Sequence, residues 1–159
     1  MKVRLALREV HRSERKLANR LDAMAARHRS DQDIHYLAHD LAGWSGKHLE
    51  EIADHSRRYG LRLSAGPRTH AITGALQARL SGALRHRPEP GLVLLADLRR
   101  IHLIAAGLSV DWELLGQVAQ AVRDQDLLDL TSRCHPDTLR QMRWANAMLK
   151  ELSPQILTS

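Results

Sequence analysis

Two histidines and two glutamates near the start of the chain have the types and spacing to form a buried polar cluster or to bind a metal. They occur as His11-x-x-Glu14 and His48-x-x-Glu51, and residues three apart share one face of a helix. Imidazole and carboxylate groups are ligands that suit Fe, Mn or Zn. The same groups also pair with each other, because a carboxylate accepts an imidazole N–H and fixes the tautomer of the ring. The four residues therefore predict either structural pairs or a metal site, with His55 on the same seam as a further candidate ligand.

Two long helices are expected to position these side chains. The first runs from Val3 to Arg29, and Glu14 falls on its apolar seam, where Leu or Ile would be expected. The second begins after Asp31, a candidate N-cap, and ends at Gly60, a candidate C′ glycine. Because only about two residues join them, the helices must form an antiparallel hairpin. The seam of the first helix consists of Val3, Leu7, Val10, Leu17, Leu21 and Met24.

The register of this hairpin predicts which side chains meet. With the turn near residue 30, residue i of the first helix lies level with a residue near 60 − i of the second, to within a turn. The pairs Glu14–His48 and His11–Glu51 both sum to 62, so one register serves both. A glutamate on an apolar seam is costly unless a partner receives it. We therefore expect Glu14 to face His48 and His11 to face Glu51.

The rest of the chain predicts a crossover and further helices, and no strand. Residues 61–90 contain Gly-Pro and Pro-rich stretches around a short helical patch, Ala71 to Leu84. After it we expect helices at 92–106, 111–130 and 137–152, with breaks at Gly107 to Ser109 and at the SRCHP turn before Pro136. The prediction is one all-α domain, residues 1–159, with a first helical hairpin (1–60), a basic crossover (61–90) and C-terminal helices (91–153).

Two phrases in these helices, LAGWSGKH and DTLRQMRW, resemble segments of small bacterial ferritin-like proteins of unassigned function. The resemblance implies a ferritin-like up-down helical bundle, two hairpins joined by a long crossover, here with one extra helix. Members of that fold often bind two metal ions between Glu and Glu-x-x-His side chains. Glu14 matches the lone Glu of this pattern. Glu51 does not begin a Glu-x-x-His motif, because the next histidine, His55, follows it by four residues. The last helix has no such motif either, since its single glutamate is Glu151. The incomplete match argues against a complete di-metal centre and leaves a mononuclear or degenerate metal site open.

The crossover is strongly basic. Between Arg57 and Pro90 there are seven arginines and a single acid, Glu89. Such a segment could bind phosphate groups of nucleic acid or an acidic protein partner, and a solvated connection would explain it as well. The candidate binding residues are Arg57, Arg58, Arg62, Arg68, Arg79, Arg85 and Arg87.

Composition narrows the class of protein. The chain has 159 residues, a formal net charge of +6 and no Phe, and its aliphatic content favours a helix bundle. The single Cys134 cannot form an internal disulfide. The most apolar stretch, GLVLLADLRRIHLIAAGL, contains four charged or titratable residues, which argues against a membrane span. With no apolar signal-peptide region near the start, we expect a cytoplasmic protein.

Three functions remain open from the sequence. The first is a non-catalytic binding or assembly module with a buried His/Glu cluster, and it is favoured over an enzyme because no catalytic triad or phosphate loop can be placed. This module is expected to form homo-oligomers, since the apolar third helix and the adjoining GLSVDWELL leave surface to cover. The second is a metal-binding protein of metal storage or oxidative-stress protection. The third is a basic accessory protein that binds nucleic acid or an acidic partner.

Overall fold

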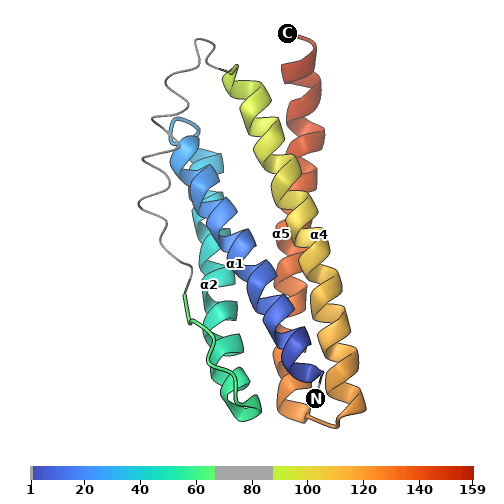
Figure 1. Ribbon diagram of the computed structural model, residues 1–159. Coiled ribbons are helices and arrows are strands. Elements are labelled where there is room, and N and C mark those ends of the chain that lie inside the picture. The colour runs from blue at the N-terminus through green and yellow to red at the C-terminus, as the bar shows by residue number, and fades with distance from the viewer. Residues whose placement is uncertain (1, 67–87) are drawn as a thin grey trace.

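The protein is a bundle of long helices (Figure 1). The computed structural model describes residues 2–66 and 88–159, and within these ranges all regular structure is helical. The all-α prediction is therefore confirmed. The elements are α1 (Val3–Arg27), α2 (Gln32–Ser56), a short 3-10 helix η1 (Arg57–Tyr59), α4 (Pro90–Ala121) and α5 (Gln125–Leu157).

The helices form two antiparallel hairpins that pack against each other. The α1–α2 turn lies at one end of the bundle, and the α4–α5 turn and the N-terminus lie at the other (Figure 1). Helix α1 packs against both α2 and α4, and α2 contacts α5 less extensively. The end of α2 and the start of α4 lie at opposite ends of the bundle, as the expected crossover requires. The predicted patch at 71–84 lies outside the described residues.

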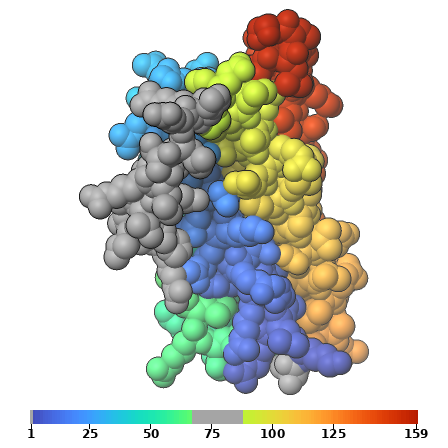
Figure 2. Space-filling model, turned by 45° about the horizontal axis from the view of Figure 1, so that its top comes forward, coloured from blue at the N-terminus to red at the C-terminus, as the bar shows by residue number. Residues whose placement is uncertain are grey.

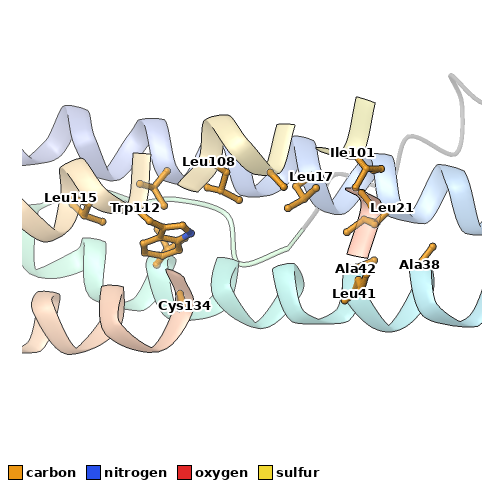
Figure 3. Close-up of a cluster of buried hydrophobic side chains, with 14 of the residues drawn as sticks. Leu17, Leu21, Ala38, Leu41, Ala42, Ile101, Leu108, Trp112, Leu115 and Cys134 are labelled. Carbon is orange, nitrogen blue, oxygen red and sulfur yellow. The ribbon is translucent and has the colours of Figure 1, made fainter. Parts of the chain in front are cut away.

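Apolar side chains at helical spacing form the core. On α4 the buried positions recur every three or four residues along the whole helix. Trp112 is 0% exposed and has the largest of the fully buried side chains. It lies near Leu115, Leu108 and Cys134, with Leu17 further along the cluster (Figure 3). The buried positions of α4 are Leu94, Leu98, Ile101, Ala105, Leu108, Trp112, Leu115 and Ala119, together with the acidic Asp97.

The predicted break at Gly107 to Ser109 is wrong, because α4 continues through it to Ala121. Gly107 is exposed and lies off the apolar seam. The seam continues without interruption from Ala105 through Leu108 to Trp112. A glycine inside a helix costs only about 1 kcal/mol relative to alanine. Burial of the surrounding seam outweighs that cost.

The predicted turn before Pro136 is also wrong, and Pro136 lies inside α5. Proline removes one backbone N–H, here the donor to the carbonyl of Ser132. Both Pro136 and Ser132 are exposed, so water can reach this carbonyl. The described residues consequently hold four long helices, where the sequence predicted four bundle helices and one extra helix.

The helix ends follow local backbone chemistry. Asp31 is confirmed as an N-cap, its side chain accepting the N–H of Ile34 at 3.2 Å. Gly60 has a φ of 67° after the short η1, which confirms the C′ glycine. The α4–α5 turn has neither Gly nor Pro, and Arg123 takes a φ of 57° there. Asp124 then caps α5 by accepting the N–H of Leu127 at 3.0 Å.

Within the described residues, no helix combines the length and apolar character needed to cross a membrane.

Candidate functional site

Glu14 is the centre of a buried polar network. Its carboxylate is 0% exposed, as its place on the α1 seam requires. Oε1 accepts a hydrogen bond from Nδ1 of His48 at 2.8 Å and another from Nε1 of Trp112 at 3.0 Å. The predicted Glu14–His48 contact is therefore confirmed, and Trp112 is a partner that the sequence did not indicate.

The network continues from His48 to α5. The second ring nitrogen, Nε2, lies 3.3 Å from Oδ2 of Asp137. Asp137 also accepts a hydrogen bond from Arg140 at 2.9 Å, near the surface. The chain of contacts thus takes Trp112 from α4, Glu14 from α1, His48 from α2 and Asp137 from α5. One residue from each long helix takes part, so the network ties the two hairpins together at one level of the bundle.

A second contact between α2 and α5 supports this level. Nε2 of the buried Gln141 donates to the carbonyl of Leu41 at 2.9 Å and to Oγ of Ser45 at 3.0 Å. Gln141 lies one turn after Asp137, and Ser45 lies three residues before His48. The two polar contacts fix the register between α2 and α5, which otherwise share few contacts.

The charges around His48 favour the protonated ring. Burial opposes protonation, but the hydrogen bonds and negative charges of Glu14 and Asp137 outweigh it and raise the pKa of His48 above 6.5. A protonated imidazole donates from both nitrogens, which matches a carboxylate on each side. The ring of Trp112 meets the His48 ring nearly edge-on, with an interplanar angle of 87°. Protonation of His48 would therefore place a cation between the carboxylates of Glu14 and Asp137.

The network is buried, and it does not bring three metal-ligating side chains of the described residues together. The side chain of His48 is only 4% exposed. Within residues 2–66 and 88–159, no three His, Cys, Asp or Glu side chains come together as ligands. Oε2 of Glu14 is buried and has no hydrogen-bond partner in that part of the chain. The arrangement of the network suits structural pairing. At its centre, Oε2 of Glu14 is the acceptor that receives no hydrogen bond from the described residues.

The predicted His11–Glu51 pair is wrong. Nε2 of His11 instead contacts the carbonyl of Ser64 at 2.8 Å, in the segment after η1. Burial, and to a lesser degree the charge of Arg15, lower the pKa of His11 although the Ser64 contact raises it. Glu51 is 42% exposed and accepts a hydrogen bond from Arg133 at 2.7 Å. The hairpin register was correct for Glu14 and His48, but Glu51 points outward towards α5.

His55 belongs to a separate group at the α4–α5 turn. Its Nε2 lies 3.4 Å from Oδ2 of Asp124, the N-cap of α5. The same carboxylate oxygen accepts the phenol hydroxyl of Tyr59. Burial and this contact with an anion raise the pKa of Tyr59 to about 12. Of the five predicted ligands, only Glu14 and His48 meet.

Another buried carboxylate joins α1 to α4 at the opposite end. Asp97 accepts hydrogen bonds from Nη1 of Arg27 at 2.9 Å and is contacted by Nε2 of His28 at 2.9 Å. Its partners come from the end of α1 and not from its own helix, α4. These partners are separated from it by about 70 residues, so only the packing of α1 on α4 reveals them.

The crossover arginines are only partly described. Arg57 pairs with Asp54 and Arg58 pairs with Asp126, both on the surface. Arg62 is exposed. The remaining predicted binding residues, Arg68, Arg79, Arg85 and Arg87, lie outside the described residues.

Comparison of the chain with protein-family models, with curated proteins and with solved structures gave no match.

Proposed function

We propose that this protein is a non-catalytic, ferritin-like helical bundle that acts as a binding and assembly module, in which the Glu14–His48 network is structural. The observation that carries the proposal is that each long helix contributes one residue to that network. Both ring nitrogens of His48 face carboxylates, which leaves no ring nitrogen as a free metal ligand. The ferritin-like part of the proposal is supported by two antiparallel hairpins whose connecting ends lie at opposite ends of the bundle.

The alternative is a metal-binding protein with Fe, Mn or Zn at Glu14 and His48. The unpartnered Oε2 of Glu14 is the observation in its favour. Elemental analysis of protein purified without chelators separates the two. Folded, metal-free protein supports the structural network. Stoichiometric metal that is lost in a Glu14→Ala, His48→Ala double variant would support the metalloprotein.

The assembly part of the proposal rests on the outer side of α4. Val110 and Leu114 are 55% and 58% exposed and lie one turn apart on that helix. Exposed apolar residues in a row often mark contact surfaces between subunits. We expect light scattering to show a homo-oligomer that dissociates in a Val110→Glu, Leu114→Glu variant. A wild-type protein that is monomeric at high concentration would contradict this.

A further inference from the structure

A basic groove lies between α1 and α4, away from the buried network. Figure 2 views the face on which these two helices adjoin. The groove has a volume of about 770 Å³, which is within the usual range for small-molecule sites. Five cations line it: Arg12, Lys16 and Arg20 from α1, and Arg99 and Arg100 from α4. Arg12 is paired with Glu9, which also lines the groove. Its size and charge make it a candidate site for an anion.

The other four cations have no carboxylate partner among the described residues. Among the ion pairs of the described residues, none includes Lys16, Arg20, Arg99 or Arg100. Residues 67–87 contain no Asp or Glu, so they cannot supply an anion to neutralise the groove. Burial lowers the pKa of Arg20, the charges of Arg100 and Arg27 lower it further, and the charge of Asp97 raises it. The groove therefore holds mutually repelling positive charges.

The acids nearest to this group are already occupied. Asp97 is held by Arg27 and His28. Asp111, at the far end of the groove, accepts a hydrogen bond from Ser13 at 2.6 Å. An anion from outside the chain would thus reduce the repulsion that Asp97 offsets only in part.

We propose that this groove binds a small molecule bearing two or more linked phosphate groups. Lys16 and Arg20 are one helical turn apart, about 6 Å along α1, and Arg99 and Arg100 are adjacent on α4. This compact group matches a diphosphate or triphosphate. A DNA duplex would need phosphate contacts spread over a larger surface.

The remainder of the groove suits the organic part of such a ligand. The exposed Leu103 and the half-buried Ile104 provide apolar contact surface next to the cations. Asp111 and Glu9 make the far end acidic, so the phosphates are oriented towards Arg20 and Arg100. This inference rests on the proposed function as a binding module and supplies its ligand class.

Calorimetric titration of the full chain at low ionic strength tests the site, with inorganic triphosphate and ATP as separate probes. An Arg20→Gln, Arg100→Gln variant should bind each probe at least about tenfold more weakly, because it loses two charge-assisted contacts. Lys16→Gln with Arg99→Gln should weaken binding in the same direction. Arg8→Gln with Arg143→Gln is the matched control. It removes the same charge from exposed positions outside the groove and should change affinity by less than about twofold.

Three results would overturn the site. They are wild-type protein that binds neither probe, a control variant that loses as much affinity as the groove variants, and a short DNA duplex that binds more tightly than triphosphate with the same dependence on Arg20 and Arg100. Circular dichroism of each variant confirms that it is folded. Metal analysis of the same samples keeps the two proposals separate: metal-free protein without phosphate binding rejects the groove alone, whereas stoichiometric metal rejects the structural network.

Discussion

Replacement of Glu14 by leucine should destabilise the protein strongly unless His48 is replaced as well. In the Glu14→Leu variant the N–H groups of His48 and Trp112 lose their shared acceptor inside the bundle. The positive ring of His48 also loses the buried one of its two carboxylates. Breaking a buried ion pair by removing one partner costs about 3–5 kcal/mol. We expect the free energy of unfolding to fall by that amount.

The double variant, Glu14→Leu with His48→Leu, should recover much of this loss. It removes the buried charge together with its partner, and the added leucines extend the apolar seam. The N–H of Trp112 remains without an acceptor, at a cost of about 1–3 kcal/mol. The coupling energy between Glu14 and His48, taken from the four proteins of the cycle, should therefore be at least about 2 kcal/mol.

Urea unfolding followed by circular dichroism measures each free energy. Asp54→Asn is a matched control, because the Asp54–Arg57 pair is exposed on the surface. Such a pair contributes at most about 1 kcal/mol. A structural Glu14–His48 pair is refuted if Glu14→Leu is as stable as the control. It is also refuted if the double variant loses as much free energy of unfolding as the two single variants lose together.

Further predictions concern titration, reactivity and the backbone. The raised pKa of His48 means that wild-type protein should exceed His48→Gln in stability most at pH values below about 6.5, with the advantage lost as pH rises through the folded pKa; a constant difference from pH 5 to 9 would contradict this. Absorbance at 295 nm should show a tyrosinate step near pH 12 that is missing from Tyr59→Phe. Burial raises the pKa of the Cys134 thiol, so a thiol reagent should label Cys134 in urea and leave it unmodified in native buffer. Gly60→Ala should cost about 1 kcal/mol because of the positive φ, whereas Gly46→Ala, in α2 with open space at the added Cβ, should gain up to about 1 kcal/mol in urea unfolding.

The sequence predicted those features that depend on local periodicity. The seam of α1 made Glu14 an anomaly, and the short turn at Asp31 fixed the register that placed His48 opposite it. The same register failed for His11 and Glu51, because a difference of a fraction of a turn directs a helical side chain to another neighbour. Contacts between hairpins, such as Trp112 and Asp137 with this network, carry no local signal.

The helix breaks were mispredicted because glycine and proline were given too much weight. Gly107 and Pro136 are both on exposed sides of their helices, where the local penalty is small compared with burial of a continuous seam. The actual turn uses Arg123 and Asp124, and of these only the capping aspartate has a recognisable preference. The basic groove was not anticipated either, since its cations come from two helices that meet only in the folded bundle.

The ¹⁵N spectrum of the His48 ring tests the central claim most directly. It should be recorded near pH 6.5, before and after addition of one equivalent of Zn²⁺. If the ring is a structural cation between Glu14 and Asp137, both nitrogens will carry protons and neither signal will shift with zinc. A ring nitrogen that loses its proton and shifts as zinc is added would show instead that His48 is a metal ligand.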